Sequence, residues 1–176
     1  MDALQMILER RSCRVYQDKP VPEDVIENLL RAGMYAPSAQ NSQPWEFLVM
    51  QDAEKKAAAA GLVSFWGVLK SAPLGILVMA NLVSYRSSTP EFFVQDCAMC
   101  AENILLAAHA QGLGGVYMGL YPKQDIMKKM RGIYSIPDEI LPFALLSIGY
   151  PEKPVPPHTT FHVKKVHRDI YTEHDK

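Results

Sequence analysis

The sequence predicts an α+β sandwich, in which helices pack on a mostly antiparallel sheet. Apolar segments of strand length are mixed with amphipathic helices along the chain. Their order is too irregular for the alternation that builds a doubly wound parallel sheet. The chain has 176 residues, 48% hydrophobic and 21% charged, with no internal repeat or long linker. A chain of this size buries a substantial core, so residues 1–176 are expected to form one domain.

In the first half of the chain, apolar periodicity and proline positions indicate the helices. Pro22 is expected to open a helix, because its missing N–H costs nothing in the first turn. The residue before Pro37 avoids helical backbone angles, so the same helix ends there. Its buried stripe is expected to comprise Val25, Ile26, Leu29, Leu30 and Gly33. Helices are also expected over residues 2–10, where Leu4, Ile7 and Leu8 have helical spacing, and 52–60.

Four apolar segments are expected to be strands. Residues 45–50 read WEFLVM, and residues 73–80 read PLGILVMA with few polar positions. The second of these is therefore expected to be buried on both faces. Residues 115–119 (GVYMG) and 141–149 (LPFALLSIG) are expected to form a short strand and the last central strand.

A long helix is expected between the second and third strands. Thr89 and Pro90 are typical of a helix start, and Gly112 of a helix stop near Gln111. The helix is apolar nearly all round, which is typical of a central buried helix. Its apolar residues include Phe93, Cys97, Cys100, Ala101, Ile104, Leu105 and Ala108. A further helix is expected over residues 123–130.

Composition and charge exclude several classes of function. With 18 basic and 19 acidic residues the chain has a formal net charge of −1, without the basic face of a nucleic-acid-binding protein. Its longest apolar stretch, residues 73–83, is too short to span a bilayer. Charged residues near position 10 replace the apolar run of a signal peptide, and three cysteines make no disulfide framework. A soluble, cytoplasmic protein without a nucleic-acid or membrane partner is therefore expected.

Residues 10–14 read RRSCR and place three guanidinium groups and a hydroxyl within five residues. A phosphate group prefers such bidentate, charge-assisted donors. A solvated helix end, where basic side chains interact favourably with the helix dipole, is the alternative for the same residues. The segment is a candidate anion site, and both interpretations stay open.

Residues 36–45, APSAQNSQPW, connect the second helix to the first strand. Small residues let a backbone approach a flat ligand closely, while Ser38, Asn41 and Gln43 offer hydrogen-bonding groups to its polar rim. Pro37 and Pro44 stiffen the loop. The alternative is an ordinary helix-to-strand connection.

Residues 112–119, GLGGVYMG, do not make a dinucleotide fingerprint, because Tyr117 occupies the place of the last glycine. The segment also follows a helix and enters a strand, the reverse of the order in a Rossmann site. Two interpretations stay open: a helix cap with close packing, or backbone N–H groups that point at a ligand.

The cysteines and histidines are not expected to form a catalytic or metal site. Cys97 and Cys100 lack a second ligand pair and a thioredoxin-like context, so they are interpreted as core residues. His109 on the same helix is interpreted as a satisfied core histidine. Prolines 156 and 157 argue against the helix that would bring two tail histidines to one metal. The tail histidines are His158, His162, His167 and His174.

Taken together, these segments resemble the nitroreductase family of FMN-dependent oxidoreductases. RRSCR and the following PVPEDVIENLLRAGMYAPSAQNSQPWEF are similar to the family's opening. DCAMCAENILLAAHAQGLGGVYMG resembles its central helix and flavin-facing segment, and LLSIGYPEKPVPPH its last core strand and tail. The resemblance covers most of the chain. It implies a nitroreductase-like fold and an interlocked homodimer with two FMN sites at its interface.

The resemblance also implies which residues bind FMN. Arg10 and Ser12 would hold the phosphate with help from Arg11, and Arg14 would lie near the pyrimidine edge of the flavin. The 36–45 loop of the partner subunit would cover the ring, and a backbone N–H of the GVYMG segment would point at N5. Because FMN carries the chemistry, no catalytic side chain is expected. The implied cofactor-binding residues are Arg10, Arg11, Ser12, Arg14, Pro37, Ser38, Ala39, Asn41, Tyr117, Met118 and Gly119.

Two positions depart from the family pattern. Members usually carry a basic residue shortly before a Val–His pair in the tail, but Thr159 or Thr160 stands at that position here. The candidates to replace it are Lys164, Lys165 and His158. Longer members also supply a lysine and an asparagine before the second strand, and neither can be assigned within residues 64–70, SFWGVLK.

The resemblance implies an enzyme that passes electrons from NADH or NADPH through FMN to a nitroaromatic or quinone, in two half-reactions. Residues 85–93 and Trp66 are candidates for the substrate side, although core or dimer contacts explain the same aromatics. The alternatives are a specialised relative, such as a reductive dehalogenase or a flavin-fragmenting enzyme, and a flavin-binding module without turnover. Residues 151–176 are expected to form a tail over the surface or the partner subunit.

Overall fold

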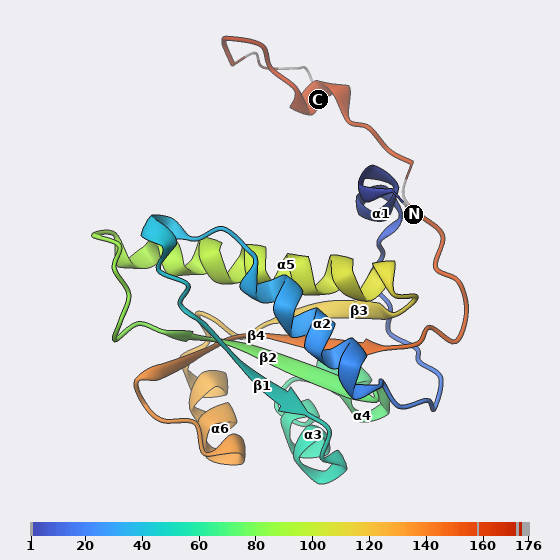
Figure 1. Cartoon of the computed structure of the whole chain (residues 1–176), viewed down its shortest axis with the longest axis vertical. Helices are drawn as coiled ribbons and strands as arrows, with labels where there is room; N and C mark the ends of the chain where they lie inside the picture. The colour runs from blue at the N-terminus through green and yellow to red at the C-terminus, as the bar shows by residue number, and fades with distance from the viewer. Residues whose placement is uncertain (1, 158, 172, 174–176) are drawn as a thin grey trace.

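The computed structural model describes residues 2–157, 159–171 and 173. Within these residues, four strands form one sheet in the order β1-β2-β4-β3, and every neighbouring pair is antiparallel (Figure 1). The predicted α+β class is confirmed. The strands are β1 (Trp45–Met50), β2 (Leu74–Asn81), β3 (Gly114–Gly119) and β4 (Ile140–Gly149).

Helices cover both faces of the sheet. Two of them, α2 and α5, lie on one face, while α3, α4 and α6 lie on the other, and α1 stands beyond one end of α5 (Figure 1). The helices are α1 (Ala3–Glu9), α2 (Glu23–Met34), α3 (Ala53–Ala60), α4 (Val68–Ser71), α5 (Phe93–Ala110) and α6 (Gln124–Tyr134). Short 3-10 turns are Ala39–Asn41, Ser64–Gly67, Pro90–Phe92 and Val163–Lys165.

The central strand β2 is buried on both faces, as its sequence predicts. Ile76 and Val78 belong to the core between the sheet and α2 and α5. Leu77 and Met79, the alternate side chains, belong to the core on the opposite face, together with Trp66. The period of two along the strand thus divides its apolar side chains between two cores.

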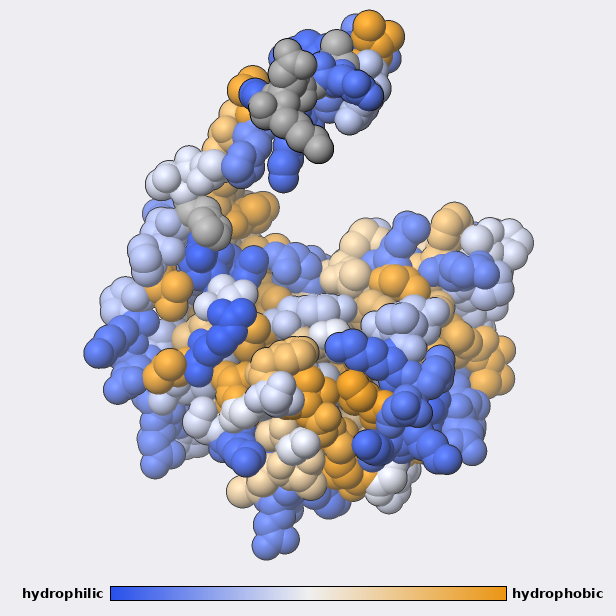
Figure 2. All heavy atoms as spheres, turned by 180° about the vertical axis from the view of Figure 1, so that it is seen from behind, coloured by the Kyte–Doolittle hydropathy of each residue, from blue (hydrophilic) through white to orange (hydrophobic). Residues whose placement is uncertain are grey.

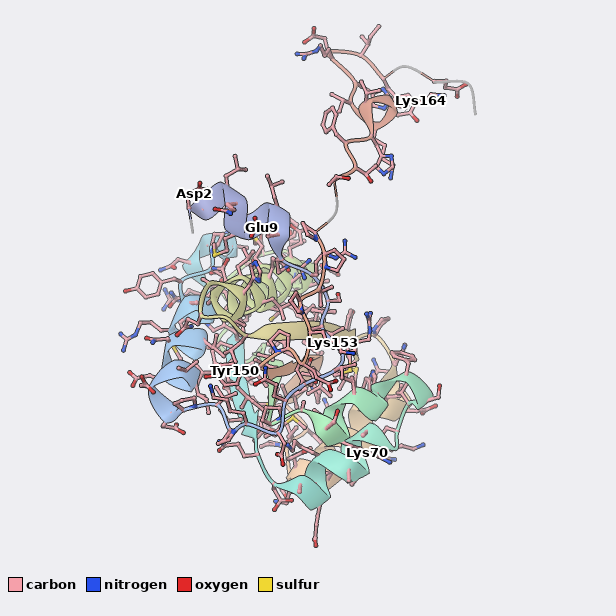
Figure 3. All side chains as sticks on the ribbon, turned by 90° about the vertical axis from the view of Figure 1, so that its right-hand side faces the viewer. Asp2, Glu9, Lys70, Tyr150, Lys153 and Lys164 are labelled. Atoms are coloured by element: carbon pink, nitrogen blue, oxygen red, sulfur yellow. The ribbon has the colours of Figure 1, made fainter. Side chains whose placement is uncertain are left out.

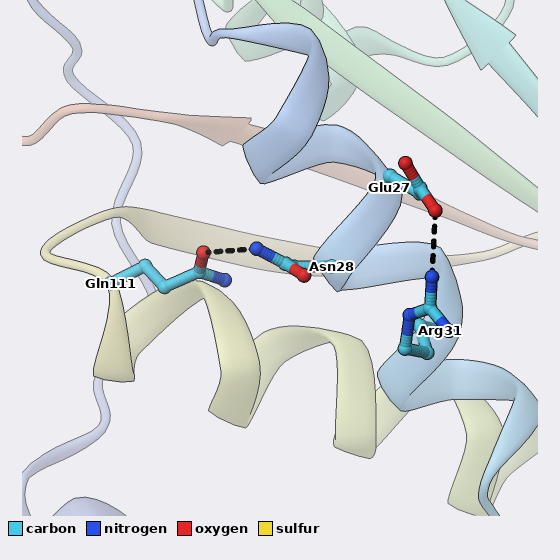
Figure 4. Close-up of polar contacts among 4 residues, drawn as sticks. All are labelled: Glu27, Asn28, Arg31 and Gln111. Atoms are coloured by element: carbon cyan, nitrogen blue, oxygen red, sulfur yellow. Dashed lines mark hydrogen bonds and ion pairs between the residues drawn. The ribbon is translucent and has the colours of Figure 1, made fainter.

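Helix α2 crosses α5 at a glycine. A Cβ atom on Gly33 would lie 2.9 Å from Cγ1 of Ile104 and 3.1 Å from Sγ of Cys100, so the absence of a side chain permits the close approach. Near the end of α5, Asn28 donates a hydrogen bond of 3.4 Å to Gln111, and Arg31 pairs with Glu27 on the outer side of α2 (Figure 4). Three of the five predicted stripe residues of α2, namely Ile26, Leu29 and Gly33, are buried, and Val25 and Leu30 are partly buried.

Helix α5 differs from its prediction, because only one side of it is buried. Every apolar residue named for its buried side is buried, from Phe93 to Ala108. The opposite side exposes Gln95, Met99 and Glu102, and Met99 is 38% exposed. The sequence predicted a buried helix because apolar residues occur nearly all round it. In the single chain that prediction is wrong for one side. An apolar residue such as Met99 gives the same sequence pattern whether it is exposed or in a core.

Several element boundaries also differ from the sequence-based expectations. Helix α6 continues to Tyr134, and Thr89–Pro90 precede a 3-10 turn before α5 begins at Phe93. The 3-10 turn and α4 between residues 64 and 71 were not predicted, since four-residue elements are too short to show a period.

The described residues 159–171 project away from the body of the fold (Figure 1). Lys164 lies on this projection, whereas Tyr150 and Lys153 lie on the body (Figure 3). Phe161, Val163 and Tyr171 expose most of their surface there. Whether these residues cover a partner subunit stays a prediction.

We expect Gly33→Ala to leave the protein less stable than Gly132→Ala by about 1–3 kcal/mol, the usual cost of one extra methyl group in a packed core. Gly132 lies in α6, and a Cβ there would meet nothing within 4 Å. Both substitutions gain the same helix propensity, so their difference isolates the contact with Ile104. Urea unfolding at one protein concentration measures it, and equal stabilities would contradict the close helix crossing.

Candidate functional site

The RRSCR segment runs beside the edge strand β3. Ser12 forms an isolated parallel bridge with Gly115, and the backbone N–H of Cys13 donates to the Gly115 carbonyl at 3.0 Å. The buried Tyr16 hydroxyl lies 2.8 Å from the Cys13 carbonyl and 2.9 Å from the Ser147 carbonyl. Burial of this phenol raises its pKa, so it stays a hydrogen-bond donor. Residues 10–16 are thus attached to the sheet edge.

A groove of about 210 Å³ lies between this segment and β3. Of the predicted site residues it contains Arg14, Tyr117 and Met118, and Tyr117 is 40% exposed. Burial raises the pKa of Tyr117, so its phenol stays neutral at ordinary pH. Phe65 and Val68, which were not predicted as site residues, also line it. The groove combines a guanidinium with apolar and aromatic walls.

A second groove, of about 270 Å³, lies at the end of α5. Arg11 and His109 line it, and among the described residues Nη1 of Arg11 and Nε2 of His109 are buried without a hydrogen-bond partner. His109 is therefore not the satisfied core histidine that the sequence suggested. Glu9 is the acidic residue of the same groove. Two buried nitrogens without partners are what an anion would satisfy.

Ser12 is exposed, and Arg10 is partly exposed. Nε of Arg10 is 3.1 Å from a carboxylate oxygen of Glu102, and both side chains are partly exposed. A third groove, of about 310 Å³, contains Arg14 and Lys153. Lys153 thus supplies a basic side chain beside the segment, whereas Lys164 and Lys165 lie on the projection (Figure 3). His158 lies outside the described residues.

The 36–45 loop lies at the opposite end of α5. The N–H of Ala39 donates to Oδ1 of Asp96, in the first turn of that helix, at 3.0 Å. Arg11 shares its groove with His109, in the last turn. At about 1.5 Å per residue, Asp96 and His109 are separated by roughly 20 Å along the helix. One chain therefore brings Arg14, Tyr117 and Met118 together, whereas the loop residues Pro37, Ser38, Ala39 and Asn41 lie at the other end of α5 from Arg11 and His109.

Asp96 is a residue that the sequence-based analysis missed. It is 2% exposed and accepts a second hydrogen bond, of 2.7 Å, from the Tyr85 hydroxyl. Burial and the neighbouring carboxylate raise the pKa of Tyr85. Its place between Phe93 and Cys97, on the apolar side of the helix, is the signal that could have identified it, because buried carboxylates are rare unless they are paired.

Cys97 and Cys100 are both completely buried, which agrees with their interpretation as core residues. Burial raises the pKa of Cys97 to about 12, and burial also raises that of Cys100.

Among the described residues, no group of three or more His, Cys, Asp or Glu side chains could hold a metal ion. The same part of the chain contains no helix of the length and apolarity that crossing a membrane requires.

Figure 2 shows the side of the molecule opposite to the view of Figure 1. Apolar side chains are exposed in the middle of this side and polar side chains surround them. A single chain thus leaves apolar surface uncovered. Other exposed apolar residues lie on α1, where Leu4, Ile7 and Leu8 are 65%, 56% and 59% exposed.

Comparison with known proteins gives a consistent result. The sequence model of one family, described as the nitroreductase family, matches residues 7–66 and 60–150. A protein of Methanothermobacter thermautotrophicus, provisionally named NADH dehydrogenase/NAD(P)H nitroreductase, is 38% identical over 95% of this chain and 86% of its own length. A protein of Archaeoglobus fulgidus with the same name is 41% identical over 86% of each chain.

Solved structures agree with this result. A crystal structure from Bacteroides thetaiotaomicron with the same provisional name has a TM-score of 0.90 at 37% identity, covering 96% of this chain and 98% of that one. An FMN-dependent nitroreductase from Clostridium difficile has a TM-score of 0.87 at 26% identity, covering 96% and 99%.

We expect Cys97 and Cys100 to resist thiol reagents in the folded protein. With a pKa of about 12, roughly one Cys97 side chain in ten thousand is a thiolate at pH 8. Ellman's reagent followed by mass spectrometry should find both thiols unmodified in buffer and modified in urea. Rapid modification of Cys97 in the folded protein would show that it is not a core residue.

Proposed function

Because this chain belongs to the nitroreductase family and is an oxidoreductase, we propose that it binds FMN and transfers electrons from NAD(P)H to an electron-poor acceptor. Nitroaromatics and quinones are the proposed acceptors. The observation that carries the proposal is the groove beside β3, where Arg14 lies with Tyr117 and Met118. FMN-dependent activity is named for a structural relative, which supports the choice of cofactor.

The residues of this groove fit a flavin ring. Tyr117, Phe65 and Val68 offer apolar and aromatic surface, which suits a flat tricycle. The Arg14 guanidinium offers a permanent positive charge, which would stabilise negative charge on the pyrimidine end of the ring. When bound, FMN supplies the hydride and electron chemistry, and the protein supplies position and electrostatics.

The residues at the end of α5 fit the phosphate end of the cofactor. Arg11 and His109 each have a buried nitrogen in this groove to which no described residue is hydrogen-bonded, and Arg10 lies next to Arg11 in the chain. Charge-assisted hydrogen bonds to a phosphate would satisfy both nitrogens. We propose that Arg10, Arg11 and Ser12 hold the phosphate and that His109 assists them. Glu9 adds one negative charge nearby, which the basic residues must outweigh.

A homodimer would complete the site. The 36–45 loop and the groove of Arg11 and His109 are at opposite ends of α5, so a second copy would be needed to bring the two together. Leu4, Ile7 and Leu8 of α1 offer exposed apolar surface that a partner would bury. We propose that the partner's Pro37, Ser38, Ala39 and Asn41 cover the ring, that Gly119 and its neighbours lie along it, and that the tail extends over the partner.

Spectroscopy of the purified protein tests the proposal. Flavin absorbance should be present or appear with added FMN, bleach when NADH or NADPH is added without oxygen, and return with a nitroaromatic or quinone. A bound flavin that never bleaches would favour a binding module without turnover. A protein that binds no FMN would overturn the proposal.

We expect Arg10→Ala to weaken FMN binding by about 1.5–3 kcal/mol, the value of one charge-assisted hydrogen bond. Arg31→Ala is the matched control, because Arg31 also pairs with a glutamate but lies on the outer side of α2. Fluorescence titration of FMN measures both. Equal affinities of the two variants would count against the phosphate assignment.

Mixing two inactive variants tests the shared site. Arg14→Ala and Asn41→Gly would each damage both sites of their own dimer, and glycine accepts the left-handed backbone at position 41. In mixed dimers one site carries both changes and the other carries neither. Co-refolding equal amounts should therefore restore about a quarter of the wild-type activity, as statistical pairing of a two-fold dimer requires. No restored activity would place Asn41 and Arg14 in the same subunit's site.

A further inference from the structure

Two loops of the fold meet at one buried carboxylate. Oδ1 of Asp96 accepts the backbone N–H of Ala39, and Oδ2 accepts the hydroxyl of Tyr85. Ala39 belongs to the 36–45 loop, and Tyr85 to residues 82–89, between β2 and α5. With both oxygens in use and only 2% of Asp96 exposed, the charge is compensated by donors from two different loops.

Ser42 connects the same two loops a second time. Its Oγ donates to the carbonyl of Ala39 at 2.6 Å and accepts the backbone N–H of Arg86 at 3.2 Å. The two connections are independent, because one uses a side chain of α5 and the other a side chain of the loop itself. Residues 37–43 and 82–89 are therefore tied together at two points.

Three residues of the 36–45 loop have unfavourable backbone conformations. Gln40, Asn41 and Gln43 have φ values of 50°, 51° and 46°, in the left-handed region that side chains other than glycine disfavour. Such conformations are unfavourable and persist only where the surroundings hold them. Asp96 holds Ala39 directly before Gln40, and Ser38 Oγ accepts the N–H of Gln43 at 3.0 Å.

We propose that Asp96 is a positioning residue that holds residues 37–43 and 82–89 as one unit. The inference rests on the proposed function, in which residues 37–43 cover the flavin of the partner subunit. Because residues 82–89 are tied to that cover, they lie at the acceptor side of the partner's flavin and limit which acceptors reach it. Asp96 therefore controls the acceptor site without touching the flavin.

Amide hydrogen exchange tests the unit without any flavin. Asp96→Asn keeps only one of the two acceptor oxygens, so exchange should rise about tenfold or more in both segments, as expected when a hydrogen bond to a charged group is lost. Tyr85→Phe removes one hydroxyl, so exchange should rise in residues 82–89 and remain low at Ala39. Asp52→Asn is the matched control, because Asp52 caps α3 on the other face of the sheet and asparagine caps a helix equally well. An unchanged Ala39 amide in Asp96→Asn would overturn the proposal.

Kinetics and flavin spectra then test the role at the acceptor site. In the holoenzyme, Tyr85→Phe should raise the KM for a quinone about tenfold or more, the range expected for one hydrogen bond to a charged group, while FMN affinity and the reduction rate by NAD(P)H stay the same. Asp96→Asn should raise the same KM at least as much and change the visible circular dichroism of bound FMN. If wild-type protein binds FMN but both variants keep the wild-type KM, the positioning role is wrong. If wild-type protein binds no FMN, the proposed function is wrong, while the exchange experiment still decides whether the unit exists.

Discussion

The attachment of residues 10–16 to the edge strand β3 is the constraint on which the candidate site depends. A Cβ atom at Gly114 would lie 2.5 Å from the Cβ of Cys13, so the two segments can lie this close only because position 114 has no side chain. The N–H of Cys13 and the hydroxyl of Tyr16 then bind the segment to the sheet. This attachment places Arg14 beside Tyr117 and directs Arg11 to the end of α5. Without it, the basic residues would have no defined position relative to the sheet.

The sequence predicted the elements whose periodicity is long or unambiguous. Residues 45–50 form β1 as expected, and the apolar run that contains β2 is buried on both faces. Arg14, Tyr117 and Met118 were expected in one site and do line one groove. The exposed side of α5 was not predicted, since Met99 satisfies an apolar pattern whether it faces a core or an interface. Asp96 and the unpartnered Nε2 of His109 depend on contacts between segments distant in sequence, which periodicity cannot reveal.

The length of α5 separates two groups of candidate site residues. Arg11 and His109 lie near its C-terminal end, while the strained loop is held at its N-terminal end by Asp96. A rigid helix cannot bring its own ends together, so in the proposed homodimer the two groups would meet between chains. Cofactor binding and subunit association would then stabilise one another, because a ligand that contacts both subunits binds the assembled state preferentially.

The position of β4 in the sheet has a consequence for biosynthesis. It is the last strand of the sequence, yet it lies between β2 and β3 and pairs with both. While a ribosome is still making the nascent polypeptide, β2 and β3 each present an unpaired edge toward the missing neighbour. Unpaired edges are prone to pair with other chains. The sheet therefore closes only when Ile140–Gly149 has emerged, and until then these edges stay open to pairing with other chains.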